Sequence, residues 1–328
     1  MSSNTQIGRA RAGANIALIK YWGKRSGSSL NLPATSSLAV TLDDLQTTTE
    51  VSVCADFSTH EVRLNDEVVD DPRLVAFLDH IRGLVGSDAP FARVISGNNF
   101  PTAAGLASSA SGYAALTLAA TQAYGLDLDA NALSVLARMG SGSAPRSLWS
   151  GFSIMHRGER DDGLDAIAKP LLDADSWPLE VVIAITAHGP KSVSSRVGMN
   201  HTMATSPYYS AWVEHNEARL DDAAAAVLAK DFEKLADLSE ASALQMHASA
   251  MAAEPGVLYW NSATMACLHA IRDARAKGQG VFFTVDAGPQ VKAICLPGAS
   301  SQVADALRGV SGVLDVHCTQ LGAGAERL

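Results

Sequence analysis

The sequence has few cysteines, and none stands where a metal site or a redox pair would need it. Its four cysteines are scattered along 328 residues and form no CxxC pair. This spacing gives no sign of a zinc site and fits buried free thiols in a reduced compartment. The residues concerned are Cys54, Cys267, Cys295 and Cys318.

Long apolar runs are also missing. The longest lies around residues 181–187, whereas a helix that crosses a bilayer needs about 20 apolar residues. Residues 1–14 are polar and small, without the apolar centre of a signal peptide. Together with the cysteine pattern, these absences predict a cytoplasmic protein with no membrane partner.

Positive charge is scarce as well. The chain has 25 Lys and Arg against 34 Asp and Glu, a formal net charge of −9, and no dense basic block. Such a protein is not expected to bind nucleic acid or anionic membranes. It can still bind a small anion if its few cations gather in one cleft.

The chain does contain enough apolar material for two packed domains. Apolar residues make up 47% of the sequence and charged residues 18%, so there is no signature of disorder. At this length two domains are expected, and we place them at residues 1–185 and 186–328. No internal repeat or low-complexity linker separates them.

The predicted elements favour an α+β fold over a doubly wound sheet, because strands and helices do not alternate regularly. The first half mixes strands with helices, and the second half has mainly helices on a small sheet. The expected strands are 14–22, 38–44, 47–53, 179–187 and two within 280–297. The expected helices are 72–85, 131–140, a long helical region over 206–251, 262–277 and 300–310.

One helix-length segment, NNFPTAAGLASSASG at residues 98–112, consists largely of side chains too small to fill a core. A helix cannot yet run at Pro101, but one fits after it. The unpaired N–H groups and dipole of a helix N-terminus form an anion site, and Ser108 and Ser109 add hydroxyls for phosphate or Mg²⁺. The segment is not a GxxxxGK[ST] loop. Taken alone, it fits a close-packed Ala/Gly helix without a ligand equally well.

Two lysines stand out in IKYWGK. Lys20 and Lys24 flank Tyr21 and Trp22 at the end of a predicted strand, and Gly23 interrupts the run. Lysines are usually solvated surface residues, but this arrangement resembles a rim presented to a ligand.

Two further charged residues lie in short motifs. Arg146 follows Ser141 and Ser143 in SGSAPRSL, and its planar fork of donors suits a carboxylate or phosphate. The alternative is an N-capping serine with a surface arginine. Asp286 follows an apolar strand in VDAGP, where it is either functional or a plain turn residue. No histidine has the spacing of a catalytic triad or a metal site.

Six segments resemble, in order along nearly the whole chain, the diphosphomevalonate decarboxylases of the GHMP kinase superfamily. They are ANIALIKYWGKR (14–25), NLPATSSLAVTLD (31–43), NNFPTAAGLASSASG (98–112), GSGSAPRSLWSGF (140–152), SSRVGM (194–199) and FTVDAGPQV (283–291).

The resemblance implies a two-domain GHMP kinase fold with the active site in the interdomain cleft. Its N-terminal domain would resemble domain 2 of ribosomal protein S5, and its C-terminal domain would be ferredoxin-like. The implied reaction is the ATP-dependent conversion of (R)-5-diphosphomevalonate to isopentenyl diphosphate, ADP, phosphate and CO₂ in the mevalonate pathway of isoprenoid biosynthesis. It proceeds through phosphorylation of the C3 hydroxyl. Members of the family are commonly homodimers.

The resemblance also assigns roles to residues. Asp286 is the catalytic aspartate that faces the C3 hydroxyl, Lys20 balances its charge, and Arg146 lies near the carboxylate that leaves as CO₂. Mg²⁺ would be bound to ATP, with Ser108 or Ser109 as its candidate protein ligands. Substrate contacts are expected at Tyr21, Trp22, Lys24, Ser141, Gly142, Ser143, Arg146, Arg196 and Met199. ATP phosphates are expected at Ala103, Ala104, Gly105, Leu106, Ala107, Ser108 and Ser109.

The sequence departs from the family pattern beside these positions, at Pro145, Ser150 and Gln290, which puts local loop geometry in question. Alternatives on the same fold are a phosphomevalonate decarboxylase, a mevalonate 3-kinase, and a catalytically inactive ATP-binding sensor. Lys20 with Asp286 argues against the pure kinase, and Arg196 argues against the monophosphate enzyme. A loop over 60–71 or 192–206 is expected to close over the site.

Overall fold

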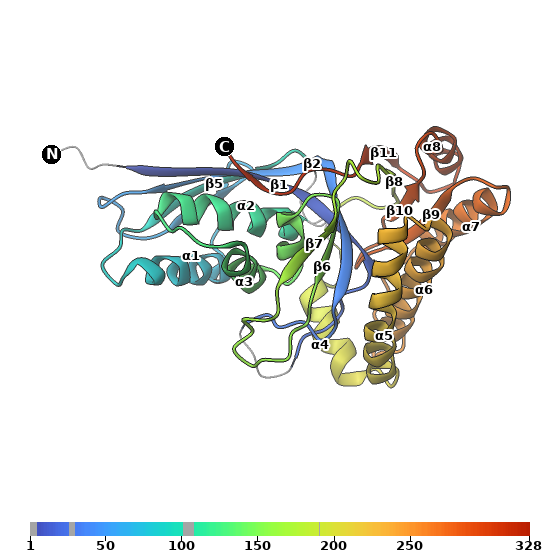
Figure 1. Cartoon of the computed structure of the whole chain (residues 1–328), viewed down its shortest axis with the longest axis horizontal. Helices are drawn as coiled ribbons and strands as arrows, with labels where there is room; N and C mark the ends of the chain where they lie inside the picture. Colours follow the sequence, from blue (N-terminus) through green and yellow to red (C-terminus); the bar gives the residue numbers. More distant parts are fainter. Residues whose placement is uncertain (1–4, 26–29, 101–107, 190) are drawn as a thin grey trace.

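The computed structural model describes residues 5–25, 30–100, 108–189 and 191–328 and has two β-sheets with helices packed on them (Figure 1). The helices are α1 (Pro72–Val85), α2 (Ser108–Ala123), α3 (Ala130–Gly140), the 3₁₀ turn η1 (Ala144–Leu148), α4 (Ser195–Thr205), α5 (Tyr209–Ala229), α6 (Phe232–Met251), α7 (Ser262–Ala276) and α8 (Ser300–Arg308). The strands are β1 (Gln6–Ile19), β2 (Ser37–Val53), β3 (Glu61–Leu64), β4 (Glu67–Val68), β5 (Ala92–Asn98), β6 (Phe152–Met155), β7 (Ala168–Leu172), β8 (Glu180–Ile185), β9 (Val281–Val285), β10 (Val291–Cys295), β11 (Asp315–Gln320) and β12 (Glu326–Arg327).

The first sheet is built on two long antiparallel strands, β1 and β2. The sequence predicted two short strands at 38–44 and 47–53, but β2 is continuous over 17 residues. It stays extended because it has partners along most of its length: β6 along its first part and β5 along its second. Near the middle the register with β1 shifts between Gly13 and Asn15. A Cβ at Gly13 would lie 2.2 Å from the Leu42 carbonyl oxygen, so only glycine allows this close approach.

Helix α2 explains the abundance of small residues in its sequence. It lies against β1, where a Cβ at Gly8 would stand 2.1 Å from the Ala119 carbonyl oxygen. Ala110, Ala114 and Ala119 have no exposed surface. The close-packed Ala/Gly helix considered from the sequence is therefore present, and its N-terminal residues Ser108 and Ser109 also line a cavity.

The second sheet has the order β11-β8-β10-β9 and is antiparallel throughout. Side chains on one face pack with α7 and α8. Side chains on the other face, among them Val181, Phe282 and Ile294, join a core with β1, β2, α5 and α6. This shared core fixes the first sheet against the second. No helix in the described part of the chain is both long and apolar enough to span a membrane.

The division into two units stays a proposal, although sheet membership bears on its position. The chain crosses from one sheet to the other between β7 and β8, ahead of the boundary proposed at residue 185. Its last residues then return to the first sheet, where Arg327 pairs with Ala10 of β1. The confirmed elements include α1, for which the predicted and observed bounds coincide.

Candidate active site

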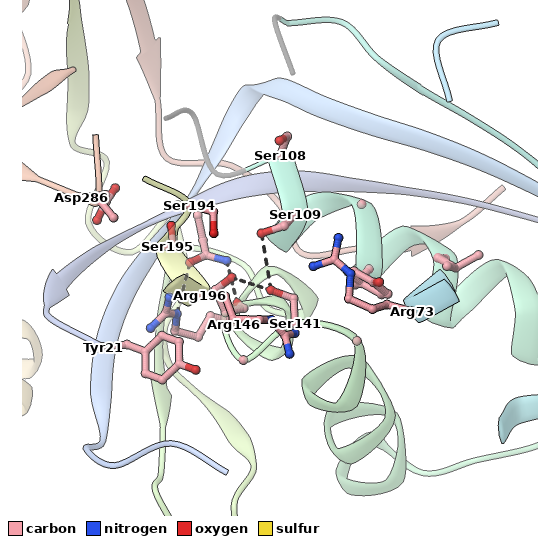
Figure 2. Close-up of a pocket in the computed structure, with 18 of the residues that line it drawn as sticks. Tyr21, Arg73, Ser108, Ser109, Ser141, Arg146, Ser194, Ser195, Arg196 and Asp286 are labelled. Carbon is pink, nitrogen blue, oxygen red and sulfur yellow. Dashed lines mark hydrogen bonds between the residues drawn. The ribbon is translucent and has the colours of Figure 1, made fainter. Parts of the chain in front are cut away.

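A cavity of about 560 Å³ lies where the two sheets meet. It collects side chains from both halves of the chain, as Figure 2 shows for Tyr21, Arg146, Arg196 and Asp286. Every candidate site residue that the structure describes lines this cavity; residues 103–107 of the expected phosphate loop lie outside the described part. The candidates brought together are Lys20, Tyr21, Trp22, Lys24, Ser108, Ser109, Ser141, Gly142, Ser143, Arg146, Arg196, Met199 and Asp286.

The centre of the cavity is an ion pair between Lys20 and Asp286. Lys20 follows β1 and Asp286 follows β9, and Lys20 Nζ lies 2.7 Å from Asp286 Oδ1. The lysine side chain is 1% exposed and the aspartate side chain 24%, so the carboxylate is the member that faces the cavity. Asp286 Oδ2 has no hydrogen-bond donor among the described residues. Oδ2 is itself buried, so a bound molecule would meet the exposed part of the carboxylate.

Burial and charge act in opposite directions on this pair. Burial alone would raise the pKa of the Asp286 carboxyl, but Lys20, Lys292 and Arg146 outweigh it and hold that pKa well below the usual range. Burial lowers the pKa of Lys20 to about 8, although Asp286 works against the shift. At neutral pH the aspartate is therefore ionised and the lysine is protonated.

The backbone of Lys20 is fixed by the second half of the chain. Its N–H donates to Ser242 Oγ of α6 at 3.0 Å, and its carbonyl accepts from Asn216 Nδ2 of α5 at 3.0 Å. Ser242 Oγ in turn donates to Asn216 Oδ1 at 3.1 Å. All three residues are buried, so these bonds hold the end of β1 with little competition from water.

Arg146 is a second fixed charge that lines the cavity. It is 3% exposed, and its guanidinium donates through Nη1 to Ser37 Oγ at 2.6 Å and through Nε to Asn15 Oδ1 at 3.1 Å. No carboxylate among the described residues pairs with it, and burial lowers its pKa to about 10. A buried cation with neutral partners can bind an anion without first breaking an ion pair.

Further cations line the cavity. Lys24 donates through Nζ to Asn31 Oδ1, and burial together with Arg196 and Arg73 lowers its pKa to about 8. Lys191 donates to Ser195 Oγ and to the Ala287 carbonyl, each at 2.7 Å, and burial lowers its pKa to about 8. This gathering meets the condition under which an acidic chain can bind anions.

Sequence reasoning missed three of the cations near the cavity. Arg73 stands directly after the Asp71-Pro72 start of α1 and resembles an ordinary helix-terminal residue. Lys191 lies in a polar loop, where a lysine is unremarkable. Lys292 carried a usable signal, because a lysine within the otherwise apolar strand VKAIC is expected to be buried with a partner.

One arm of the cavity is mainly apolar and was not predicted. Its walls come from β2, β3, β5, α1 and α2, so no single sequence motif describes it. Ser96 and Asn98 at the end of β5 supply polar groups beside the apolar ones. The arm opens beside Ser108 and Ser109, which Figure 2 shows at the start of α2. Its lining residues are Thr49, Val62, Leu64, Leu74, Val94, Ser96, Asn98, Tyr113 and Leu116.

The three departures from the family pattern have identifiable partners. Gln290 accepts from the Thr186 N–H at 2.6 Å and donates to the Ala187 carbonyl at 2.7 Å, which ties the turn after Asp286 to the end of β8. Ser150 Oγ donates to the Gly322 carbonyl at 3.3 Å. Pro145 occupies the first turn of η1, where its missing N–H is not needed.

The described residues contain no group of three His, Cys, Asp or Glu side chains that could hold a metal ion. Mg²⁺ commonly keeps several waters and binds through substrate phosphates with few protein ligands. Ser108 and Ser109, whose hydroxyls line the cavity at the start of α2, fit that role for a nucleotide-borne ion.

Comparison with known proteins agrees with this geometry. Residues 12–168 match the family model of the diphosphomevalonate decarboxylase-like N-terminal domain, and residues 181–320 match that of the mevalonate 5-diphosphate decarboxylase C-terminal domain. The diphosphomevalonate decarboxylase of Candida albicans is 39% identical over 294 residues, which cover 85% of this chain and 81% of the relative.

Two solved structures have the same fold over nearly their whole length. The mevalonate diphosphate decarboxylase of Staphylococcus aureus superimposes with a TM-score of 0.91 at 34% identity, covering 99% of this chain and 98% of the other. The structure of MDDEF in complex with MVAPP, AMPPCP and magnesium superimposes with a TM-score of 0.90 at 38% identity, covering 99% of both chains. The fold is therefore the two-domain GHMP kinase fold, and the chain belongs to the diphosphomevalonate decarboxylase family.

Proposed function

We propose that this chain catalyses the ATP-dependent decarboxylation of (R)-5-diphosphomevalonate to isopentenyl diphosphate, ADP, phosphate and CO₂, a step of the mevalonate pathway. The observation that carries the proposal is the Lys20–Asp286 pair, which faces the same cavity as Arg146 and the start of α2. The binding of MVAPP, AMPPCP and magnesium by MDDEF supports the same choice of substrates and metal.

Each part of the substrate has a complementary group. The carboxylate would meet Arg146, and the C3 hydroxyl would donate to the carboxylate of Asp286. The diphosphate would lie beside the cations Lys24 and Arg196, which line the same cavity. The ATP phosphates would approach Ser108 and Ser109 at the N-terminus of α2, and the base would enter the apolar arm.

The reaction needs a better leaving group than hydroxide, which phosphorylation of the C3 oxygen supplies. Asp286 orients the hydroxyl and accepts its hydrogen bond, and its fixed negative charge favours the positive charge that develops at C3 as phosphate departs. Arg146 holds the carboxylate whose C–C bond breaks to give CO₂ and the alkene. Magnesium, when bound with ATP, neutralises phosphate charge during transfer. Lys24 and Arg196 bind the distant diphosphate and thereby fix C3 for in-line transfer.

A direct assay tests the proposal. The purified protein is incubated with Mg-ATP and, separately, with mevalonate, its 5-phosphate or its 5-diphosphate, and ADP and CO₂ are measured. Equal amounts of ADP and CO₂ with the diphosphate alone are expected. Turnover of the monophosphate would show that the substrate is 5-phosphomevalonate instead of the diphosphate. ADP formation without CO₂ would show a 3-kinase that does not decarboxylate. ATP binding without turnover of any of the three compounds would favour a catalytically inactive sensor.

We propose further that the protein works as a homodimer in the cytoplasm. The support is family membership together with the scattered free cysteines. Light scattering after size-exclusion chromatography tests the assembly, and a monomer at assay concentration would contradict it.

Gly142→Ala is expected to raise KM for the diphosphate substrate about tenfold, the equivalent of ~1.4 kcal/mol. A Cβ at this position would lie 2.4 Å from Tyr21 Oη, so the tyrosine must leave its place at the cavity wall. Steady-state kinetics measure the effect. Gly83→Ala in α1 is the matched control, because nothing lies within 4 Å of its Cβ and its KM should not change. An unchanged KM for Gly142→Ala would show that Tyr21 does not contribute to substrate binding.

The pH dependence should show an alkaline loss of substrate affinity. Burial lowers the pKa of Lys20, Lys24 and Lys191 to about 8 in each case. Below that pH all three are charged and attract the anionic substrate; above it they lose the proton and the attraction. We expect kcat/KM to fall between about pH 8 and pH 10, measured by initial rates.

Lys24→Arg provides the internal comparison for the pH profile. A guanidinium stays charged throughout this range, so the part of the loss that belongs to the diphosphate contact should move to higher pH. A wild-type profile that stays flat to about pH 10 would contradict the assignment of these lysines.

A further inference from the structure

Lys292 is a lysine in an unusual place. It is the second residue of β10, is 2% exposed, and has apolar neighbours on either side in VKAIC. Its partners across the sheet are Thr284 of β9 and Ile183 of β8. Because side chains alternate along a strand, Lys292 shares a face with Ile294, which packs in the core between the two sheets. Its ammonium group is therefore directed into the molecule.

The ammonium group reaches the catalytic carboxylate from the opposite side to Lys20. Lys292 Nζ lies 3.4 Å from Asp286 Oδ2, whereas Lys20 Nζ lies 2.7 Å from Oδ1. One lysine comes from the first sheet and the other from the second, so each carboxylate oxygen has its own cation. Oδ2 is also the oxygen that has no hydrogen-bond donor among the described residues.

A purely structural role does not account for this arrangement. Methionine would fill nearly the same volume, and replacing a whole buried ion pair by apolar side chains is often neutral or favourable for folding, whereas removing one member leaves the other charge unpaired. Asp286 would keep Lys20 as its partner if Lys292 were replaced. A lysine at this position does something that methionine could not: it attracts a carboxylate and limits its rotation about Cβ–Cγ. The strand fixes the lysine backbone, so the constraint is transmitted to Asp286.

We propose that Lys292 is a positioning residue that acts through Asp286. By holding Oδ2 from the buried side, it fixes the orientation in which the carboxylate faces the hydroxyl that is to be phosphorylated. Lys292 does not itself bind substrate in this arrangement, since Asp286 lies between it and the cavity. The inference rests on the proposed function, because it assigns a task to Asp286 in that reaction.

Lys292→Met is the first test. We expect kcat to fall about 100-fold, the size of effect that follows from misplacing a catalytic group. KM for ATP and for 5-diphosphomevalonate should stay within about twofold, because the binding contacts are elsewhere. Ile294→Val, on the same strand and face, is the matched control for a repacked core and should keep the wild-type kcat. Thermal unfolding verifies that both variants are folded at the assay temperature.

A double-mutant cycle separates positioning from a general structural effect. In an Asp286→Ala background, Lys292→Met should cost less than about twofold in residual kcat, since the group through which it acts is gone. The proposal is overturned if Lys292→Met lowers kcat equally in the wild-type and Asp286→Ala backgrounds, or if it does not lower kcat in the wild-type background. Lys292→Arg keeps the charge and should retain more kcat than Lys292→Met. If neither variant folds, the lysine serves the fold and the proposal fails.

The wild-type assay distinguishes the two levels of inference. If the wild-type protein yields neither ADP nor CO₂, both the proposed function and this role of Lys292 are contradicted. An active wild type with an equally active Lys292→Met removes only the role of Lys292.

Discussion

Asp286→Asn is expected to lower kcat by at least about 1,000-fold while both substrates still bind. The amide has the size of the carboxylate but no negative charge, so it neither attracts the hydroxyl proton nor favours positive charge at C3. Steady-state assays of ADP and CO₂ measure the loss, and calorimetric titration measures binding. Asp315→Asn, at an exposed position in the same sheet, is the control and should be fully active.

Asp286→Asn is also expected to change the protonation of Lys20. Lys20 is buried, and Asp286 is the group that opposes the fall of its pKa to about 8. Without that charge the pKa of Lys20 falls further, so the lysine is expected to become neutral at a lower pH. A variant that kept more than a tenth of wild-type kcat would show that the carboxylate charge is not needed, and the mechanism proposed above would fail.

Arg146→Gln is expected to reduce kcat/KM for 5-diphosphomevalonate about 100-fold, equivalent to ~2.8 kcal/mol. Hydrogen bonds to charged groups carry energies of this order when they are desolvated. Here Arg146 is 3% exposed and its guanidinium is fixed by Ser37 and Asn15, so its orientation is set before substrate binds. The effect should appear with the diphosphate substrate, while the affinity for ATP alone should change little.

Two comparisons sharpen the interpretation of Arg146. Arg146→Lys keeps the charge but loses the planar fork, so it should recover only part of the activity. Arg93→Gln removes an exposed arginine from β5 and should have no effect. If Arg146→Gln bound and turned over substrate normally, the carboxylate would have to be placed elsewhere in the cavity.

The sequence was sufficient for elements with strong local signals. Helix α1 has Asp71 as its N-cap residue and Pro72 in its first turn, and both are helix-start signals that can be recognised in the sequence. Local signals did not reveal that β2 is one strand, because its continuity depends on the partners β5 and β6. The same holds for β8, whose sheet is decided by pairing with β10 and β11.

The residues of the site likewise include some that local sequence signals revealed and others that they did not. Lys20, Arg146 and Asp286 lie in compact motifs, so their residue types and neighbours pointed to them. Arg73 and Lys191 were missed because each reaches the cavity from a segment that resembles ordinary surface. The apolar arm was missed because five elements each contribute a few side chains, and only the tertiary fold brings them together.

The pairing of Lys20 with Asp286 also has a consequence for how the chain becomes active. The two residues are 266 positions apart, and the backbone of Lys20 is held by α5 and α6. Contacts between residues far apart in sequence slow folding, and this pair joins residues that follow strands of different sheets. During synthesis the lysine leaves the ribosome 266 residues before the aspartate, so the pair cannot form until that segment has been made. Catalytic activity is thus a late event, and its appearance reports that the two sheets have met.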